Sequence, residues 1–415
     1  MRILQLAGYF FPEKAASIYL EENRFEAFSK AGFTTIVYAA RPQRGLSEEE
    51  FQEYRHKNLE MMYDDSVEVH RFVMYREGKN AILRALRYFL ISLIQLWKGI
   101  WAKDIDLIYV ASTPPTQGAL AALVKKIRRV PFVYNLQDIF PDSLAGTGLA
   151  EKGGLLWKIG RVIENFTYRN ADKIIVISEG FKKNIMAKGV PEDKIVVIYN
   201  WVDEEAVVDV PRAENKLFDK YGLDRGKFYI TYNGNIGLTQ NMDLLLEVAK
   251  SLEENKDVQF VLVGNGAYFE QVKQIVKDRE ISNVHLLPFQ PYEDISHVFS
   301  LGDVSLVISK PGVGENSVPS KTWSIMSASR PILANFDENE LKSIIEDNHC
   351  GLFTKAGDKA AFTDAILKLY NNRELCKEMG KNGRKFVMDN LTKEVGTRKY
   401  VEVIKRFKDN HLNVK

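Results

Sequence analysis

Short apolar runs alternate with stretches of helical period along the first half of the chain. We expect strands at 2–8, 34–40, 67–73, 107–112, 132–138, 173–180 and 194–200. Helical spacing separates several of them, as at 17–31 and 117–127. Strands that alternate with helices of about 10–15 residues predict a parallel sheet with right-handed crossovers.

The same alternation restarts in the second half of the chain. We expect strands at 228–234, 258–264, 284–289, 304–309 and 331–335, with helices at 241–253, at 267–278 and from about 319. The charged stretch 203–226 joins the two series. The chain is therefore expected to be an α/β protein of two doubly wound domains, with its ligand at the carboxyl ends of the strands, in the cleft between the domains.

One helical stretch, AILRALRYFLISLIQLWKGIW at 81–101, is apolar but too often interrupted to cross a membrane. On a helical wheel its polar side chains share an arc of about 140°. They are Arg84, Arg87, Ser92, Gln95 and Lys98. Such a helix suits an anionic membrane interface, and it equally suits packing on the N-terminal sheet. Trp97 and Trp101, one turn apart, favour the interface.

Composition narrows the compartment and the partners. The 415 residues carry a net charge of +2, which argues against nucleic acid as a partner. The two cysteines, Cys350 and Cys376, have no zinc or redox spacing, and a disulfide framework is not expected. The N-terminus MRILQLAGYFF lacks the layout of a signal peptide. We expect a cytoplasmic protein.

The sharpest candidate for chemistry is VPSK at 318–321. Pro319 suits the first turn of a helix, and Ser317 or Ser320 can cap its free amides. Lys321 adds a full charge to the partial positive charge of the helix end, which makes an anion site. The alternative is that Lys321 is a solvated surface charge.

Glycines follow two successive strands of the second half. Gly234 and Asn235 lie in YNGNIG, and Gly264 and Gly266 lie in VGNG. Glycines at a strand end let backbone N–H groups approach a phosphate, although plain turns also use them. Phe289 ends a third strand, where an aromatic ring can flank a base or fill the core.

Carboxylates in the first half give weaker signals. Asp138 ends a strand and Asp142 follows Pro141, so the pair suits base and hydrogen-bonding roles, or a turn and a helix cap. The D-x-D pattern at 104–106 precedes its strand, which is the wrong end for holding a substrate-bound cation. No metal site is expected, and a departing diphosphate then needs lysine, amides and a helix end.

An ordered series of motifs resembles a known family. The series is YFFPE, ASTPPTQG, DIFPDS, ADKIIVISEGFK, IYNWVD, YNGNIG, VLVGNG and VPSK…RPILA. Over nearly its whole length the sequence resembles retaining glycosyltransferases of family 4, which have the GT-B fold of two Rossmann-like domains facing across a cleft. It is most similar to bacterial enzymes of capsule, O-antigen and colanic-acid-type synthesis, including N-acetyl-L-fucosamine transferases.

The resemblance implies a domain plan. Residues 1–203 would form an acceptor-binding domain, and 204–395 a domain that binds a nucleotide sugar. Residues 396–415 would form a helix that packs back on the first domain. No divalent metal would be required.

The resemblance also implies roles for the residues already singled out. Gly234 and Asn235 would border the pyrophosphate, and Asp138 would serve the acceptor side. Lys321 would neutralise the leaving group together with the amides around Val318, Pro319 and Ser320. A base pocket, most often for uracil in this family, would be lined by Gly264, Gly266 and Phe289.

Two departures from the family pattern stand out. The family usually has two glutamates eight residues apart, and counting from Pro-x-Lys puts these slots at Asn316 and Ser324, with Glu315 adjacent. We expect Glu315 or Asn316 to hold the sugar and Ser324 to make a weaker ribose contact. A basic residue is also absent after the glycine loop, where Leu238-Thr239-Gln240 stands.

The expected activity is retaining transfer of an N-acetylated amino or deoxyamino sugar from a UDP-sugar. The acceptor would be lipid-linked or a saccharide, at the inner face of the plasma membrane, with peripheral contact through 81–101. Two alternatives remain. One is a UDP-sugar 2-epimerase on the same fold, and the other is a non-catalytic protein that binds sugar nucleotides.

Overall fold

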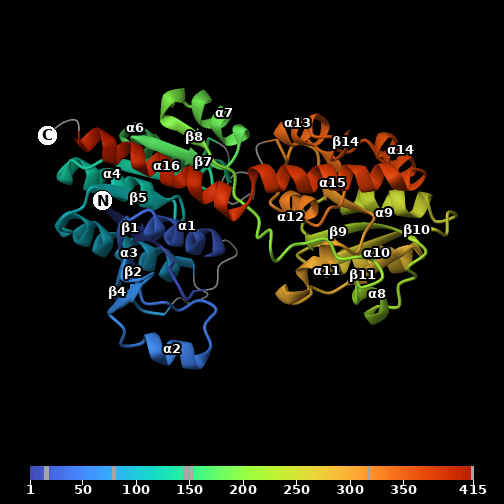
Figure 1. Cartoon of the computed structure of the whole chain (residues 1–415), viewed down its shortest axis with the longest axis horizontal. Helices are drawn as coiled ribbons and strands as arrows, with labels where there is room; N and C mark the ends of the chain where they lie inside the picture. The colour runs from blue at the N-terminus through green and yellow to red at the C-terminus, as the bar shows by residue number, and fades with distance from the viewer. Residues whose placement is uncertain (14–17, 77–80, 144–150, 152, 316–317, 413–415) are drawn as a thin grey trace. The chain divides into compact units, whose positions relative to one another are not determined.

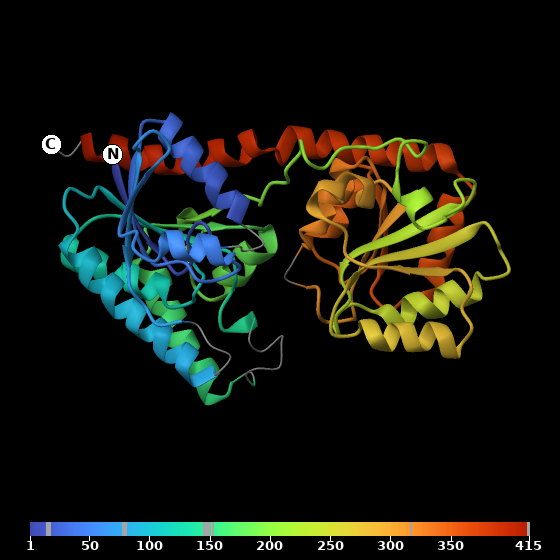
Figure 2. The ribbon, with the colours of Figure 1, turned by 90° about the horizontal axis from the view of Figure 1, so that it is seen from below.

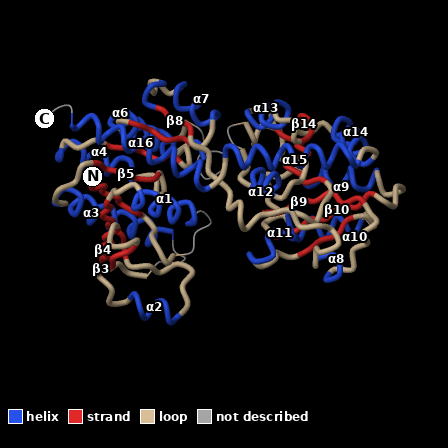
Figure 3. The backbone as a smooth tube through the Cα atoms, in the orientation of Figure 1, coloured by secondary structure: helices blue, strands red, loops and turns tan. Residues whose placement is uncertain are grey.

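The computed structural model describes residues 1–412 except 14–17, 77–80, 144–150, 152 and 316–317. The chain forms two compact units, each with its own sheet (Figures 1 and 3). Unit 1 comprises Met1–Tyr199 and Thr397–Lys415, and unit 2 comprises Asn200–Gly396.

Unit 1 is built on an eight-stranded sheet with the order β3-β4-β2-β1-β5-β6-β7-β8. All pairs are parallel except β3 with β4. The strands are β1 (Arg2–Ala7), β2 (Thr34–Ala40), β3 (Leu59–Met62), β4 (Val67–Phe72), β5 (Leu107–Ala111), β6 (Phe132–Leu136), β7 (Lys173–Val176) and β8 (Ile195–Val197).

Helices cover this sheet. They are α1 (Ile18–Lys30), α2 (Glu48–Tyr54), α3 (Ala81–Trp101), α4 (Gln117–Arg128), α6 (Leu155–Asn170), α7 (Glu179–Ala187), the 3-10 turn η1 (Glu192–Lys194) and most of α16 (Lys393–Leu412). Helix α4 packs on the central strands and against both α3 and α6. Its Ala121 and Val124 join Leu4 and Ile108 in the core. At the C-terminal end, the Tyr400 hydroxyl donates to Asn135 Oδ1 at 3.1 Å, which ties α16 to β6.

Unit 2 has a six-stranded sheet with the order β11-β10-β9-β12-β13-β14, and all its pairs are parallel. The strands are β9 (Phe228–Asn235), β10 (Val258–Asn265), β11 (Val284–Leu287), β12 (Val304–Ile308), β13 (Ile332–Phe336) and β14 (Gly351–Lys355). The helices are α8 (Leu217–Lys220), α9 (Met242–Ser251), α10 (Phe269–Asp278), η2 (Tyr292–Asp294), α11 (Ile295–Phe299), α12 (Lys321–Ser327), α13 (Glu340–Asp347), α14 (Lys359–Tyr370) and α15 (Arg373–Asn390).

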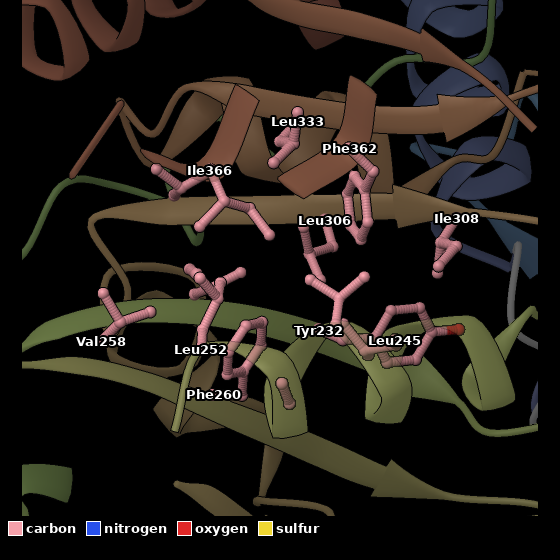
Figure 4. Packing of buried hydrophobic residues seen from close by; sticks show 14 of the residues in the cluster. Tyr232, Leu245, Leu252, Val258, Phe260, Leu306, Ile308, Leu333, Phe362 and Ile366 are labelled. Atoms are coloured by element: carbon pink, nitrogen blue, oxygen red, sulfur yellow. The ribbon is translucent and has the colours of Figure 1, made fainter. Parts of the chain in front are cut away.

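The core of unit 2 lies between the sheet and helices α9 and α14. Tyr232 of β9 and Leu306 of β12 lie in one cluster with Leu245 of α9 and Phe362 of α14 (Figure 4). Alternate positions of each strand face this core because successive side chains point to opposite faces of a sheet. This fixed register holds the strand ends that form the candidate site.

The expected strands are present, most of them within two or three residues of the expected ends. The run 173–180 is shorter as a strand, because the Ser178 side chain accepts from the N–H of Phe181 and begins α7. Strands β3 and β14 were not expected from the apolar pattern. Cys350 and Cys376 are both free and buried, in accord with the expected lack of a disulfide.

Helix α3 lies on the outside of unit 1, where Figure 2 shows it as the long cyan helix. Among the described residues, none of the helices is both long and apolar enough to span a bilayer. The sequence left two environments open for 81–101. In the structure this helix buries Arg87, Ser92 and Gln95 together with Ile91, and it leaves several large apolar side chains exposed.

Candidate functional site

The glycines predicted from the sequence meet at one edge of unit 2. Strands β9 and β10 are in parallel register, so that Gly234 pairs with Gly264 and Asn235 pairs with Asn265. Both pairs lie at the carboxyl ends of the strands, where ligands of open α/β sheets bind. The two Gly-Asn motifs therefore form one feature, as their repetition indicated.

Backbone packing explains why glycine is needed here. A Cβ atom on Gly264 would lie 1.9 Å from the carbonyl oxygen of Gly234, which no side chain can accommodate. Gly234 itself has a φ of +125°, a conformation that favours glycine. A Cβ atom on Gly266 would lie 2.5 Å from Asn235 Oδ1. These contacts show that the two strand ends pack closely on each other, backbone against backbone.

Lys321 reaches this edge from α12. Its ammonium lies 3.8 Å from the ring centroid of Tyr232, in a cation-π contact. A Cβ atom built on Gly234 would lie 3.8 Å from the same nitrogen. The lysine and the first glycine loop therefore adjoin, as the family resemblance implied. The alternative of a solvated surface charge is not supported.

The surroundings of Lys321 disfavour its charge. Burial lowers the pKa of its ammonium to about 7. In the described part of the chain, no carboxylate lies within 4 Å of this nitrogen, so the Tyr232 ring, and no counter-charge, offsets part of the loss of water. An anionic ligand would supply the missing counter-charge and raise the pKa again.

The helix itself differs from the expectation. It begins at Lys321 instead of about 319, and Pro319 precedes it with its carbonyl accepting from the N–H of Thr322 at 2.9 Å. Ser320 occupies the N-cap position, but its side chain makes no capping hydrogen bond. The expected cap by Ser320 is therefore wrong, and the helix end is free of any side-chain acceptor at that position. Ser317 lies outside the described residues.

The loop before α12 is held from the next strand. Asp337, which follows β13, accepts from the N–H of Gly312 at 2.9 Å and from that of Gly314 at 2.7 Å. Asn339 donates to the carbonyl of Gly314 at 2.7 Å. This brace orients the chain that leads to Glu315, whose side chain is exposed. Asp337 could not be identified from the sequence, because its contacts depend on how the chain folds around the end of β13.

The remaining predicted donor residues occupy mixed positions. Phe289 is 60% exposed just beyond β11, so the alternative of a core aromatic is wrong. Val318 is partly buried, and Ser324 is partly buried on the second turn of α12. Asn316, predicted to contact the sugar, lies outside the described residues. None of these positions establishes a contact with a ligand.

Three polar side chains that sequence reasoning missed lie at the same edge. They are Asn233 of β9, Ser309 after β12 and Thr322 of α12, and each is at least nine-tenths buried. Within the residues that the structure describes, both side-chain atoms of Asn233 and the two hydroxyls have no hydrogen-bond partner. A buried polar group without a partner costs about 1–3 kcal/mol, so a ligand or water here would relieve that cost. In the sequence, each of them is a polar residue near the end of an apolar strand or near the start of a helix, and this position is the signal that could have identified it.

The carboxylates of unit 1 divide into one exposed group and one paired group. Asp138 is exposed two residues beyond β6, and its backbone N–H donates to Ser112 Oγ at 3.1 Å. Burial alone would raise the pKa of Asp142, but the Lys188 ammonium 2.7 Å away holds that pKa below its ordinary value. Asp142 is thus part of an ion pair, which leaves Asp138 as the accessible carboxylate of the two.

The D-x-D stretch lies where the sequence placed it, before β5. Asp106 Oδ2 accepts from the backbone N–H of Arg2 at 2.7 Å, at the amino ends of the strands. Among the described residues, no group of three or more histidine, cysteine, aspartate or glutamate side chains has a metal-binding arrangement.

A pocket of about 630 Å³ opens at the amino ends of β9, β12 and β13 in unit 2, the edge opposite Lys321. Its arginines are already paired: Arg212 and Arg373 contact Asp303 at 2.6 and 3.1 Å, and Arg330 contacts Asp209 at 2.9 Å. Because these charges are satisfied within the protein, the carboxyl edge is the better candidate for a nucleotide.

Two families match the two units in turn. Residues 213–386 match Glycosyl transferases group 1, and residues 25–201 match the Glycosyl transferase 4-like domain. The first match includes the edge with Lys321 and both glycine motifs.

Curated relatives and solved structures agree with these matches. The probable glycosyltransferase WbjE of Pseudomonas aeruginosa is 25% identical over 82% of this chain and 85% of its own length. The putative colanic acid biosynthesis glycosyl transferase WcaI of Escherichia coli K12 is 27% identical over 49% of this chain and 51% of its own length. The crystal structure of Anabaena Alr3699/HepE in complex with UDP has a TM-score of 0.71 at 17% identity, over 98% of this chain and all of that one. The predicted arrangement of two Rossmann-like domains is confirmed.

Proposed function

Because this chain is a glycosyltransferase whose two α/β domains have the GT-B fold, we propose that it moves a sugar from a UDP-sugar to a lipid-linked or saccharide acceptor in bacterial surface polysaccharide synthesis. One observation carries the donor half of the proposal. Lys321 adjoins Gly234 with a pKa lowered to about 7 and without a neighbouring carboxylate among the described residues. A diphosphate is the group that would complete such a site.

The proposed mechanism follows from where charge develops. As the bond from the sugar to the phosphate breaks, the leaving diphosphate gains negative charge, which Lys321 and the backbone amides at Gly234 and Asn235 would stabilise. We propose that this arrangement serves in place of a divalent cation. The leaving phosphate oxygen would accept the proton of the acceptor hydroxyl on the same face, so that the anomeric configuration is retained.

Uridine is the proposed base. The solved complex of HepE with UDP supports this choice. In this chain the exposed ring of Phe289 beyond β11, with Gly264 at the end of the neighbouring strand β10 and Gly266 just after that strand, would line the base. Glu315 or Asn316 would hold the sugar, which we propose to be N-acetylated, and Ser324 would contact the ribose.

The acceptor is proposed to be presented at a membrane surface. The accessible carboxylate of Asp138 in unit 1 would serve the acceptor hydroxyl. Helix α3 would provide peripheral contact with the bilayer, since its exposed face carries Phe89, Trp97 and Trp101. None of the helices that the structure describes is long and apolar enough to cross the bilayer.

A donor screen tests the proposal. Thermal shifts of the full chain are measured with UDP, GDP and a panel of their sugars, with and without EDTA. We expect UDP and at least one UDP-sugar to raise the melting temperature, and EDTA to leave the shift unchanged. Absence of any shift by UDP, together with no consumption of UDP-sugars in the presence of membranes, would refute the donor assignment.

A further inference from the structure

Three neighbouring helices of unit 1 expose an unusual amount of apolar surface. Helix α4 packs between α3 and α6, and all three leave large hydrophobic side chains in solvent. The exposed set, called the three-helix surface below, consists of Leu83, Leu86, Phe89, Leu93, Trp97 and Trp101 of α3, Leu123 and Ile127 of α4, and Leu155, Leu156, Ile159 and Val162 of α6. Contiguous apolar surface of this kind marks an interaction site in a folded protein.

Helix α3 buries polar side chains together with apolar ones such as Ile91, whereas several of its largest apolar side chains lie in solvent. Gln95 is fully buried and donates to the carbonyls of Ala7 at 2.8 Å and Tyr38 at 3.0 Å. Gln117 of α4 donates to Gln95 Oε1 at 2.7 Å. Gln95 thus makes its hydrogen bonds inside unit 1, whereas Trp97 of the same helix is exposed.

The exposed residues form stripes rather than scattered contacts. On α3 they follow at three- and four-residue intervals, and the rings of Trp97 and Trp101 lie 5.7 Å apart with about two-thirds of each residue exposed. On α6, Leu155, Ile159 and Val162 repeat the same spacing, and Val162 is 69% exposed. Such stripes on neighbouring helices present one apolar face, which a flat hydrophobic medium would cover.

The charges of the three helices indicate what kind of hydrophobic surface would cover this face. Each helix carries three lysines or arginines, and the three together contain one acidic residue, Glu164. Glu164 is buried and accepts from the Tyr168 hydroxyl at 2.7 Å and from Lys188 at 3.0 Å. The exposed cations include Lys126, Arg128 and Lys158, so charge at this face is positive. Tryptophan with surrounding lysine and arginine is typical of a headgroup interface.

From the apolar stripes, the buried polar side chains of α3 and the one-sided charge, we infer that the three-helix surface docks on an anionic lipid bilayer. The inference rests on the membrane contact proposed for α3 and widens it to α4 and α6. Docking is peripheral: the apolar side chains enter the boundary between headgroups and acyl chains, and the cations meet the phosphates.

Vesicle binding of the full chain tests the inference. Sedimentation with vesicles of phosphatidylcholine alone, and of phosphatidylcholine with phosphatidylglycerol, is compared for the wild type, Val162→Glu, Ile159→Glu and Phe89→Glu. We expect binding to anionic vesicles that weakens with salt, and a loss of at least tenfold in the partition coefficient for each variant. The variants of α6 are decisive, because membrane contact through α3 alone predicts no effect of substitutions in α6.

Matched controls separate docking from folding and from donor binding. Met61→Glu in unit 1 and Met388→Glu in unit 2 place the same charge at exposed apolar residues outside the surface, and should leave vesicle binding unchanged. All variants should keep the thermal shift caused by UDP. Failure of that shift in the wild type would refute the donor proposal alone. Wild-type protein that ignores anionic vesicles, α6 variants that bind as the wild type does, or a dimer that Val162→Glu splits would each overturn the docking inference.

Discussion

Helix α3 of unit 1 and helix α9 of unit 2 both cover sheets, yet α3 buries several polar side chains where α9 buries apolar ones. Helix α9 buries Leu245 and Val248 against its sheet, in the usual arrangement. Helix α3 buries Gln95 and exposes Phe89 and Trp97. Two units of the same architecture are thus adapted to different surroundings, because the core fixes the fold while the outer faces of the helices remain free to differ.

The exposed apolar residues of unit 2 have another distribution. Leu238, Phe289 and Val313 follow β9, β11 and β12, at the carboxyl edge that carries Lys321. In unit 1 most of the corresponding residues lie on helices, although Val73 follows β4 and Met61 lies in β3. This difference agrees with the nucleotide site proposed for unit 2 and with the docking surface inferred for unit 1.

The largest expected effect comes from Lys321→Met. Loss of the ammonium should lower kcat/KM by about 10²–10³, as does loss of one group that stabilises developing negative charge. The same change should raise the melting temperature, because it removes a buried ammonium that loses its water on folding without gaining a counter-ion. Steady-state kinetics and thermal unfolding check the two parts.

Lys359→Met is the matched control for Lys321→Met. Lys359 lies in the same unit but is exposed and paired with Glu247 at 3.1 Å. Lys359→Met should change neither the kinetics nor the melting temperature by much, because an exposed ion pair contributes about 0–1 kcal/mol to the free energy of unfolding. Full activity of the Lys321 variant would remove the reason for assigning the donor to this edge.

Gly264→Ala should have the next largest effect. A Cβ atom would lie 1.9 Å from the Gly234 carbonyl oxygen and would force β9 and β10 apart at their ends. We expect UDP affinity to fall about 10- to 100-fold and the free energy of unfolding to fall by about 1–3 kcal/mol. Titration calorimetry and urea unfolding measure these changes. Gly226→Ala, before β9, meets only the Asp224 carboxylate at 3.2 Å and should be mild.

The pH dependence of donor binding should report on Lys321 directly. Below pH 7 the lysine is already charged, and affinity for a UDP-sugar should be high and nearly constant. Above pH 7 the free protein loses the proton while the complex retains it, so affinity should fall by up to tenfold per pH unit until the pKa of the complex is reached. Calorimetry in buffers of different ionisation enthalpy should show uptake of about one proton at pH 8.

The folding stability should change with pH in the opposite sense. The lysine pKa is about 10.5 when unfolded and about 7 in the folded protein, so the unfolded state binds the extra proton between these values. This group's contribution to stability therefore rises from pH 7 toward 10.5, and its cost is greatest below pH 7. An advantage of Lys321→Met that grows with increasing pH would contradict the buried, unpaired lysine.

Sequence patterns located much of this site because the determinants are local. Gly234 and Gly264 end apolar runs, and Lys321 follows a proline, so each was visible within a few residues. The orientation of α3 was not predictable, since a helical wheel separates two faces without saying which one meets protein. Asn233 escaped notice because its unpaired state depends on neighbours that only the folded sheet supplies.

Asp337→Ala should have an intermediate effect. Its carboxylate accepts from the N–H groups of Gly312 and Gly314, and their release would loosen the loop before α12. We expect KM for the donor to rise about tenfold with a smaller change in kcat, because misplaced binding groups weaken ground-state contacts first. Asp389→Ala, an exposed residue of α15, is the control. Equal kinetics for both variants would show that the brace is dispensable.

Ser324→Ala should have the smallest effect and bears on the departure from the family pattern. If the hydroxyl contacts the ribose, its removal costs one neutral hydrogen bond, about 0.5–1.5 kcal/mol, or roughly two- to tenfold in affinity for UDP. Affinity for a dideoxyribose analogue of UDP should not change, because that ligand lacks the partner hydroxyls. Affinities of the wild type and of Ser324→Ala for both ligands complete a double-mutant cycle, which isolates the contact between the serine hydroxyl and the ribose. Since Ser324 is partly buried on α12, one turn from Lys321, equal losses for both ligands would indicate a packing role and leave the ribose to another residue.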